Sequence, residues 1–554
     1  MARQASGIAA AAALTMGITL VAGPSSAVTR AVAGSLSPSA ARAHARIQPP
    51  VPAGKLRIKG DVRDGGTVAA DGLRWRPGRL PAGDRLLSFE VGYSWQACGQ
   101  HRCRAGADST ATPFAAQRYI VGHADTGRRL RVTVTATEVV QTAAKNFTFK
   151  VLRVAKSAMS ARRVASYPLG RRPVSEFVNG LPDASTASAE EYFQLDPPHY
   201  NRAEGPVVRK FRIDDGSWKL LPARGVFYTG RLPAGRHSVS VLTSDQAGRS
   251  TLSFRWRVLP MPARLACQGR CWYPPHLNKR GKPMRWDWQI GRTFPLKRTG
   301  RRAVDIYDVD GFLTTRGQIH QIRTSWPAST LTHPRTICYL DLAWEDYRPD
   351  GSPSRAGKFP AATLGRVYYG YPEERWVDFR QLDALKPMLR ERIDMCARKG
   401  FDAVELDDID SFDPPRTTGF YLTPGDAQNY LAFAFNLIHA RGMTALWKNS
   451  PALVRWGARY ADGAVVEECF VYHECGSWHA FTADKTRTQP TGKWVGEAEY
   501  GADHYVCDPG KSCKHGRSFA AYCRRIYSGK NGFAAVKFDV DLDGRTFYPC
   551  PRGR

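Results

Sequence analysis

The chain has 554 residues, too many for one ordinary hydrophobic core, so about two to four domains are expected. Its 43% hydrophobic and 11% aromatic content excludes a largely disordered protein. The formal net charge is +30, and +24 of it falls on residues 1–280, because residues 281–554 hold 39 Lys and Arg against 33 Asp and Glu. A basic half indicates either a plain solvated surface or contact with an anionic partner such as a cell wall, and no specific nucleic-acid binding is expected.

The N-terminal segment has the pattern of a signal peptide, predicted at residues 1–27. Arg3 gives a positive start, Ile8–Ala22 is almost free of polar residues, and Ser25-Ser26-Ala27 offers a small-residue cleavage site. A membrane anchor is the weaker alternative, because the apolar run is about 15 residues and spanning needs ~20. Residues 28–50 are rich in Ala, Ser and Pro, which predicts a linker. We therefore expect a secreted, extracellular protein.

Two all-β modules of immunoglobulin-like sandwich type are predicted next, at residues 51–155 and 172–260. Short alternating runs such as Arg129–Val139, separated by Gly-rich turns, are typical of sandwiches. The pattern "YSWQAC...C" from Tyr93 to Cys103 resembles immunoglobulin-like modules of bacterial surface proteins. Neither module contains a cluster of catalytic groups, so both are expected to be spacers or weak binders.

Twelve cysteines fit an exported protein, in which disulfides persist. A zinc site is the alternative, since His101 and His473 lie between members of two pairs. No two Cys-x-x-Cys units stand at zinc-ribbon spacing, so local disulfides are predicted and no metal or other cofactor is expected. The close pairs in sequence are Cys98/Cys103, Cys267/Cys271, Cys469/Cys475 and Cys507/Cys513.

Residues 280–554 alternate short apolar strands with helix-length amphipathic segments, which predicts a (β/α)₈ TIM barrel. The clearest helical segments, Gln381–Gly400 and Pro424–Gly442, each end in Gly after a basic residue. The eight predicted strands are Ala303–Tyr307, Thr336–Leu340, Arg375–Val377, Ala403–Leu406, Met443–Trp447, Gly463–Val466, Lys493–Gly496 and Ala534–Phe538.

A charged residue stands at or just past the end of every predicted strand. In a barrel these ends converge on the face where active sites are built. For any single position a solvated loop acid is an equally good explanation, but the repetition after eight strands indicates a carboxylate-lined pocket. The residues are Asp308, Asp310, Asp341, Asp378, Asp407, Lys448, Glu467, Glu499 and Asp539.

Carboxylates and a lysine, without a His cluster, indicate glycoside hydrolysis, in which one acid protonates the leaving oxygen and one carboxylate is nucleophile or base. Aromatic residues near the same ends could stack on sugar rings or pack the barrel. They are Tyr339, Trp344, Trp376, Trp447 and Tyr472.

A series of motifs across residues 284–550 resembles family 114 glycoside hydrolases, the endo-α-1,4-polygalactosaminidases. The motifs are "ICYLDLAWEDYRPD" (Ile337–Asp350), "ERWVDFR" (Glu374–Arg380), "KGFDAVELDDID" (Lys399–Asp410), "LWKNSP" (Leu446–Pro451), "VVEECFVYHEC" (Val465–Cys475) and "GEAEYG" (Gly496–Gly501). The resemblance implies a (β/α)₈ barrel, endo cleavage of an α-1,4-linked galactosamine polymer and a retaining mechanism. It also implies Asp407 as nucleophile and Glu467 as general acid/base.

The sequence departs from this family at two pairs, Asp407-Asp408 in place of Asp-Asn and Glu467-Glu468 in place of Glu-Gln. The extra acids would attract an unacetylated, cationic sugar. We expect the Asp407 and Glu467 carboxyl groups to face each other, with Asp408 and Glu468 turned away if strand alternation persists. The predicted substrate-binding residues are Asp308, Asp310, Tyr339, Trp376, Asp408, Lys448, Asn449, Tyr472, Glu499 and Tyr500.

Two other functions are compatible with the same sequence. One is a non-catalytic cell-surface or wall glycan-binding protein built on this barrel, against which the presence of both carboxylates counts. The other is hydrolysis of a different glycan by the same residues. A monomer is expected in each case.

Overall fold

The computed structural model describes residues 47–550, except 82–84, 101, 106–117, 142–148, 179–180, 270, 292–295, 297–302, 346–347, 352–358, 369–370, 413–417, 501–522, 524–531, 539–541 and 545. The predicted signal peptide, almost all of the linker, Cys507, Cys513 and Asp539 lie outside the described residues. Over the described part, no helix has both the length and the hydropathy needed to cross a membrane.

The first β unit consists of two antiparallel sheets around a core that includes the stacked rings of Trp95 and Tyr119, 5.2 Å apart. A 3₁₀ turn, η1 (His123–Asp125), precedes its longest hairpin, whose last strand runs past the predicted boundary at residue 155. One sheet contains β1 (Val51–Gly60), β2 (Thr67–Arg76) and β5 (Arg118–Ile120). The other contains β3 (Arg85–Cys98), β4 (Cys103–Ala105), β6 (Arg129–Gln141) and β7 (Phe149–Arg163).

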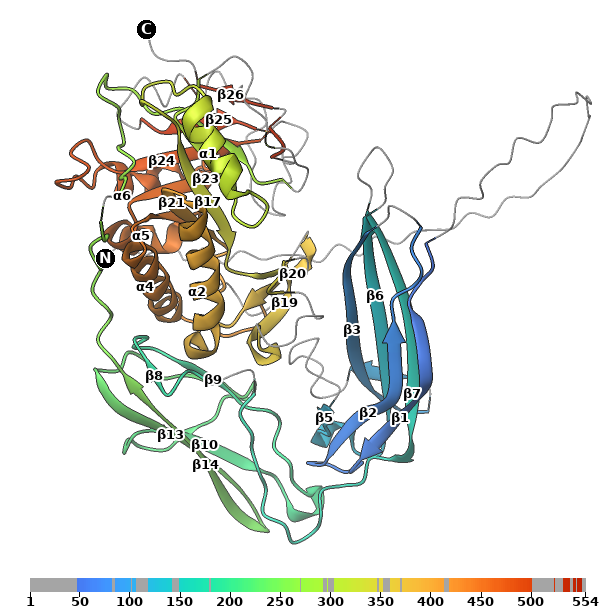
Figure 1. Ribbon diagram of the computed structural model, residues 1–554. Helices are drawn as coiled ribbons and strands as arrows, with labels where there is room; N and C mark the ends of the chain where they lie inside the picture. The colour runs from blue at the N-terminus through green and yellow to red at the C-terminus, as the bar shows by residue number, and fades with distance from the viewer. Residues whose placement is uncertain are drawn as a thin grey trace, which may run out of the picture.

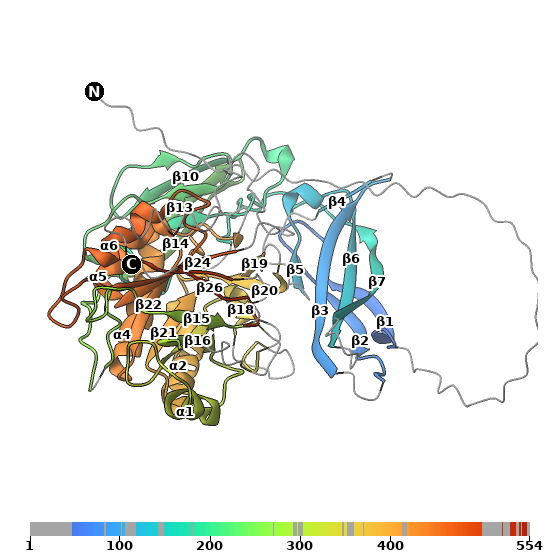
Figure 2. The same ribbon diagram turned by 90° about the horizontal axis from the view of Figure 1, so that it is seen from above.

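The second β unit is also built from two sheets, packed around Phe193, Phe211 and Trp256. The larger sheet has the order β11-β10-β13-β14-β8 and the smaller one pairs β12 with β9. Figures 1 and 2 show β10, β13 and β14 side by side in the larger sheet. Its elements are β8 (Ser185–Thr186), β9 (Tyr192–Gln194), η2 (Arg202–Glu204), β10 (Val208–Ile213), β11 (Lys219–Leu220), β12 (Val226–Tyr228), β13 (Gly235–Asp245) and β14 (Gly248–Val258).

The C-terminal α/β domain is built on a curled sheet of eight parallel strands in chain order, with a short antiparallel strand at its end. Trp286 Nε1 donates a hydrogen bond to the carbonyl of Ala534, so the first and eighth strands meet through a side chain. Backbone pairing between these two strands is not found among the described residues. The strands are β15 (Trp286–Gln289), β16 (Ile306–Asp310), β17 (Arg335–Asp341), β21 (Ala403–Asp407), β22 (Thr444–Lys448), β23 (Gly463–Glu467), β24 (Trp494–Glu499), β25 (Ala534–Lys537) and β26 (Tyr548–Pro549).

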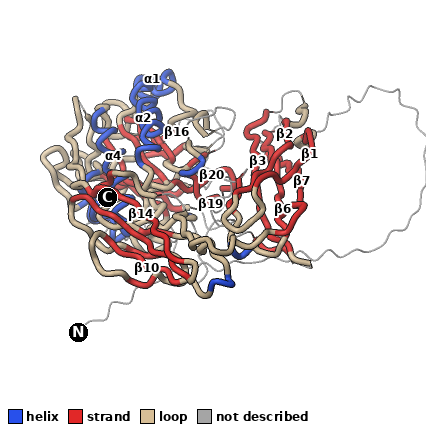
Figure 3. The backbone as a smooth tube through the Cα atoms, turned by 90° about the horizontal axis from the view of Figure 1, so that it is seen from below, coloured by secondary structure: helices blue, strands red, loops and turns tan. Residues whose placement is uncertain are grey.

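Helices lie beside the curled sheet, and two of them begin and end as the sequence predicts. Thr423 accepts a hydrogen bond from the Asp426 amide and so caps α4, whose first residue is Pro424. Gly400 ends α2 in the left-handed conformation, with φ of 89°. The helices are α1 (Arg316–Ser325), α2 (Leu382–Lys399), α4 (Pro424–Ala440), α5 (Val454–Tyr460) and α6 (His479–Thr482), with 3₁₀ turns η3 (Ala361–Thr363), η4 (Pro451–Leu453) and η5 (Cys475–Trp478). Figure 3 shows α1, α2 and α4 as blue segments beside red strands.

One predicted barrel strand is wrong and one was missed. Arg375–Val377 belongs to β20 (Tyr371–Val377), which pairs with β18 (Trp344–Glu345) and β19 (Leu364–Tyr368) in a separate antiparallel sheet. The missed strand is β15, which is only four residues long. Its sequence is "WDWQ", in which the buried Asp287 interrupts the apolar run by which a buried strand is recognised. The two errors cancel in the count, so Asp407 and Glu467 still end the fourth and sixth strands.

The second β unit is hydrogen-bonded to the N-terminal ends of two helices of the α/β domain. The amide of Ala187 donates to Asn429 Oδ1 at 3.2 Å, and Asp183 accepts from the amide of Asp383 in the first turn of α2 at 2.7 Å. Ser188 Oγ lies 3.2 Å from Thr423 Oγ1, the cap of α4. This unit therefore covers helix ends that would otherwise need water as partner.

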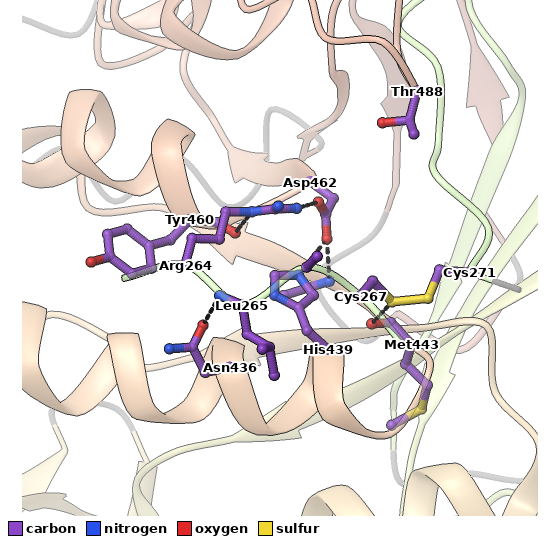
Figure 4. Close-up of polar contacts among 12 residues, drawn as sticks. Arg264, Leu265, Cys267, Cys271, Asn436, His439, Met443, Tyr460, Asp462 and Thr488 are labelled. Carbon is purple, nitrogen blue, oxygen red and sulfur yellow. Dashed lines mark hydrogen bonds and ion pairs between the residues drawn. A yellow bond between two sulfur atoms is a disulfide. The ribbon is translucent and has the colours of Figure 1, made fainter. Parts of the chain in front are cut away.

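The segment that follows β14 runs along α4 and α5 (Figure 4). Arg264 donates to Asp462 and to the carbonyl of Tyr460, and the amide of Leu265 donates to Asn436 at 2.7 Å. Asp462 also accepts from the buried His439 at 2.8 Å. The segment thus fastens the β unit to the α/β domain by part-buried and exposed polar contacts.

Three of the predicted local disulfides are confirmed, namely Cys98–Cys103, Cys267–Cys271 and Cys469–Cys475. Two further disulfides join distant residues. Cys338 of β17 is bonded to Cys396 of α2, and Cys523 is bonded to Cys550. The first of these ties the curled sheet to a helix beside it.

Candidate active site

A buried lysine lies at the centre of the C-terminal ends of β21, β22 and β23. Lys448, the last residue of β22, is 1% exposed, and its Nζ lies 2.6 Å from Asp407, 3.2 Å from Glu405 and 3.3 Å from Glu467. The ammonium also lies 4.7 Å from the ring centroid of Trp288. Burial disfavours its charged form, but the three carboxylates outweigh this and raise the pKa of Lys448 well above its usual value. A fixed positive charge therefore joins the two predicted catalytic carboxylates.

Asp407 is held at both carboxylate oxygens. Its Oδ2 accepts from Tyr339 Oη at 2.9 Å as well as from Lys448, and its Oδ1 accepts from the amide of Asp408 at 2.9 Å. The side chain remains 18% exposed. An oriented, charge-compensated and accessible carboxylate is what a nucleophile at this position requires.

Glu467 is held from the two neighbouring strands. Asn449 Nδ2 donates to its Oε2 at 2.8 Å, and the Glu467 amide donates to Asn449 Oδ1 at 2.9 Å, so one amide side chain fixes both backbone and carboxylate. Tyr500 Oη donates to Oε1. The side chain is 27% exposed, so Glu467 also faces open space.

Left-handed backbone follows each of the three site strands. Asp408, Asn449 and Glu468 have φ of 54°, 39° and 49°, which costs on the order of 1–3 kcal/mol per non-Gly residue. Strand alternation therefore ends at Asp407 and at Glu467, and the premise on which Asp408 and Glu468 were expected to point away does not hold. The strained turn after Lys448 is the one that aims Asn449 at Glu467.

A second pair of acids lies beneath the lysine. Asp308 and Glu405 are both 0% exposed, and burial together with their mutual repulsion raises the pKa of Asp308 well above its usual value. Burial also raises the pKa of Glu405, against the attraction of Lys448. Asp308 is thus a buried neighbour of Glu405, and its predicted contact with substrate stays a prediction. Glu405 was not predicted as a site residue because it lies inside strand β21. The sequence alone does not show whether a charged side chain within a strand points into the curled sheet or away from it.

Acids with raised pKa values line one side of Asp407 and one side of Glu467. Burial, Glu345 and Asp407 raise the pKa of Asp341 to about 7, and burial, Glu499 and Glu467 raise that of Glu468 to about 7. Burial, Asp341 and Asp407 raise the pKa of Asp408 well above its usual range. The site is therefore crowded with carboxyl groups that repel one another.

Three predicted residues lie elsewhere than expected. Asp310 is 1% exposed and holds both guanidinium nitrogens of Arg348, at 3.0 and 2.7 Å. Asp378 follows β20, which belongs to the small antiparallel sheet, so it does not end a strand of the curled sheet. Its carboxylate is paired with Arg380 at 2.8 Å. Trp376 is 3% exposed in the same small sheet, stacked on Tyr368 at 4.4 Å. Tertiary ion pairs and packing occupy these side chains.

The remaining predicted residues divide between the site and its surroundings. Glu499 is 2% exposed and accepts from the amide of Phe470 at 2.9 Å, so it supports the loop after β23. The amide of Tyr472 donates to the Glu468 carbonyl in that loop. Trp447 is fully buried and donates to the Asn449 carbonyl at 2.6 Å, which makes it a packing residue rather than a sugar platform.

Two groups of potential metal ligands occur among the described residues. The sulfur of Cys469 is in a disulfide, so it is not available to the group with Glu497 and Glu499. In the group of Asp341, Glu345 and Glu374, the guanidinium groups of Arg348 and Arg392 lie 2.8 and 3.7 Å from Glu345. These positive charges already compensate the acids and disfavour a divalent cation there.

Comparisons with known proteins were made for sequence and for fold. The model of glycoside-hydrolase family GH114 matches residues 267–551. No curated protein matches the chain in sequence. Among solved structures, Aspergillus fumigatus Ega3 in complex with galactosamine is 22% identical with a TM-score of 0.40, over 52% of this chain and 100% of that one. A putative alpha-galactosidase from Bacteroides fragilis is 12% identical with a TM-score of 0.18, over 53% and 56% of the two chains.

The fibronectin(III)-like modules of CbhA from Clostridium thermocellum are also similar, at 12% identity and a TM-score of 0.13, over 37% of this chain and 95% of that one. The family match is the strongest of these findings, since it spans just over half of the 554 residues and includes every strand that contributes to the lysine-centred site. The chain belongs to glycoside-hydrolase family GH114 and is a glycoside hydrolase.

Proposed function

We propose that the protein is a secreted endo-acting hydrolase of α-1,4-linked galactosamine-containing polysaccharide, with its active site on a closed (β/α)₈ barrel. The observation that carries the proposal is the position of Lys448 between Asp407 and Glu467, at 2.6 and 3.3 Å. It joins two accessible carboxylates from strands that are not neighbours in the sheet. The motifs that resemble polygalactosaminidases contain both of these residues.

The spacing of the two carboxylates supports a retaining mechanism. The oxygens that contact Lys448 can be no farther apart than the sum of those two distances, which is compatible with the ~5–5.5 Å separation of the carboxyl groups in retaining enzymes. Glu467 protonates the glycosidic oxygen while Asp407 attacks the anomeric carbon, so the glycosidic bond breaks as a glycosyl-enzyme ester forms. Water then attacks the same carbon, gives its proton to Glu467 and releases Asp407 as carboxylate.

The surrounding residues have distinct positioning roles in these steps. Tyr339 and Lys448 hold Oδ2 of Asp407 and compensate its charge before attack. The Tyr500 hydroxyl can accept as well as donate, so it can accompany Glu467 both when it carries the proton and when it does not. Asn449 keeps Oε2 of Glu467 fixed through both steps.

The crowded acids support a cationic sugar as substrate. Carboxyl groups with pKa values of about 7, as at Asp341 and Glu468, are held partly neutral by burial and mutual repulsion. An ammonium group bound near them would relieve that repulsion and leave them ionised. Unacetylated galactosamine offers one such ammonium per residue, whereas an acetylated or neutral sugar offers none.

The experiment is incubation of the full chain with de-N-acetylated and with fully acetylated α-1,4-galactosamine polymers, followed by sizing of the products. We expect mid-sized oligomers early in the reaction, which an exo-acting enzyme would not release, and faster cleavage of the de-N-acetylated polymer. The Asp407→Asn protein is the matched control, since it keeps the shape of the site without the nucleophile. Binding of both polymers without cleavage of either would favour the non-catalytic alternative.

A further inference from the structure

The second β unit presents an exposed sheet face on the side away from the α/β domain. Along β13 the odd-numbered residues from His237 to Thr243 are buried in the module core, so the even-numbered residues face outward. Figure 1 shows β10, β13 and β14 on the far side of β8 and β9 from helices α2 and α4. We call this surface the outer face; its outward residues on the three strands are Val208, Lys210, Arg212, Arg236, Ser238, Ser240, Leu242, Ser244, Arg249, Thr251, Ser253, Arg255 and Arg257.

The outer face is strongly positive. Six of its side chains are cationic, all are exposed or half-exposed, and no outward position on the three strands is acidic. None of the six is in an ion pair with another residue that the structure describes, so their charges are uncompensated within the described part of the chain. This accounts for part of the +24 charge on residues 1–280.

The register of the sheet places like charges together. Arg236 lies directly opposite Arg257 in the antiparallel ladder, and Arg255, two residues earlier, faces the same way. Like charges directly opposite each other destabilise a sheet. Three neighbouring guanidinium groups with no counter-charge among the described residues therefore make a site that a bound anion would stabilise. Guanidinium binds carboxylate or phosphate through paired hydrogen bonds.

The middle of the outer face is rich in hydroxyl groups and also contains Leu242. Ser240 and Ser253 lie opposite each other with their Oγ atoms 3.2 Å apart, flanked by Ser238, Ser244 and Thr251. At the edge, Trp218 is 37% exposed and lies under Arg212 at 4.8 Å. From Arg249 to Arg257 the face extends about 27 Å along β14, and it is about 10 Å across from β10 to β14. Its shape and polarity fit an extended hydroxylated chain with repeated negative charges.

We propose that the outer face binds an anionic polysaccharide whose carboxylates pair with the arginines. A cationic galactosamine polymer would be repelled by this face, so the partner differs from the proposed substrate. The face contains no helix that could enter a DNA groove, and its central hydroxyls do not suit a lipid surface. A polyanion bound to this face would itself bind cationic polymers, so the contact would place the hydrolase where its proposed substrate gathers. That consequence rests on the proposed function, whereas binding of the polyanion does not.

The test measures binding of the full chain to polygalacturonate at low and high salt, with neutral dextran, duplex DNA and phosphatidylglycerol vesicles as the other probes. The variant Arg236→Thr/Arg255→Thr/Arg257→Thr removes the three clustered charges from exposed strand positions. The control variant Arg74→Thr/Arg76→Thr/Arg153→Thr removes the same charge from exposed strand positions of the first β unit. We expect salt-sensitive binding to polygalacturonate that the first variant weakens by about tenfold or more and the control leaves within about twofold.

Thermal unfolding of both variants checks that the fold is intact, and cleavage of a short soluble oligomer checks that the distant active site is unaffected. Equal loss of binding in the two variants would show that net charge alone attracts the polymer and would overturn the proposal. Tighter binding to DNA or to vesicles than to polygalacturonate would overturn the choice of partner. No binding to polygalacturonate by the unchanged protein would overturn it entirely, without bearing on hydrolysis.

Discussion

Replacement of Lys448 with Met tests whether one buried ammonium holds the active site together. The change keeps most of the volume and the unbranched shape of the side chain, so the cavity it leaves is small. It removes the positive charge that contacts Glu405, Asp407 and Glu467 at 3.2, 2.6 and 3.3 Å.

The expected loss of stability follows from burial. Lys448 is 1% exposed, and breaking a buried ion pair by removal of one partner costs about 3–5 kcal/mol because the other charge is left unpaired. Here three carboxylates are left facing one another, so we expect a loss in the free energy of unfolding of about 3–5 kcal/mol at neutral pH. Turnover should fall as well, since Asp407 and Glu467 lose their common contact.

The loss of stability in the Lys448→Met protein should also depend on pH, and its direction can be predicted. Without the ammonium, the repelling carboxylates take up protons in the folded state at a higher pH than they do in the unfolded chain. Protons bound more tightly by the folded state stabilise it as the pH falls. The deficit of the Lys448→Met protein relative to the unchanged protein should therefore shrink between neutral pH and about pH 5.

The assay is urea unfolding of both proteins at neutral pH and at about pH 5, together with cleavage of a soluble oligomer. The matched control is Lys493→Met: Lys493 is 3% exposed but pairs at 2.7 Å with Asp484, whose side chain is 37% exposed and can be rehydrated. Its loss should cost only about 1–3 kcal/mol and leave turnover unchanged. An equal cost for the two substitutions, or a Lys448→Met deficit that grows at low pH, would refute the reasoning.

Three further predictions follow from the same structure. Asp407→Asn should abolish oligomer release with little change in the thermal midpoint, whereas an active Asp407→Asn protein beside an inactive Asp408→Asn protein would move the nucleophile by one residue. A chain that starts at residue 280 lacks the Arg264 contacts and should unfold at a lower temperature than one that starts at residue 172; equal midpoints would show that the β unit is not needed for the fold. Because burial and neighbouring acids raise the pKa of Asp341 from 3.8 to about 7 on folding, its contribution to stability is lost as the pH rises from about 4 to 7. The thermal midpoint of the unchanged protein should therefore fall relative to that of Asp341→Asn across this range, and a difference that stayed level or changed in the opposite direction would contradict this.

The sequence by itself determined two helices and the position of two carboxylates at strand ends, but not every strand. Helices α2 and α4 follow from apolar periodicity with a Thr423 cap and a Gly400 stop, which are interactions between residues close in sequence. Asp407 and Glu467 were placed at the ends of the fourth and sixth strands because parallel strands end on one face.

Only the tertiary structure decided which charges belong to the site. Asp310 and Asp407 both follow apolar strands in the sequence, yet Asp310 is paired with Arg348 and Asp407 with Lys448. The strand β15 was missed for the same kind of reason, since four residues are too few to show a period and only their pairing with β16 makes them a strand. Electrostatic and hydrogen-bond partners are set by distance in space, and residues far apart along the chain supply them.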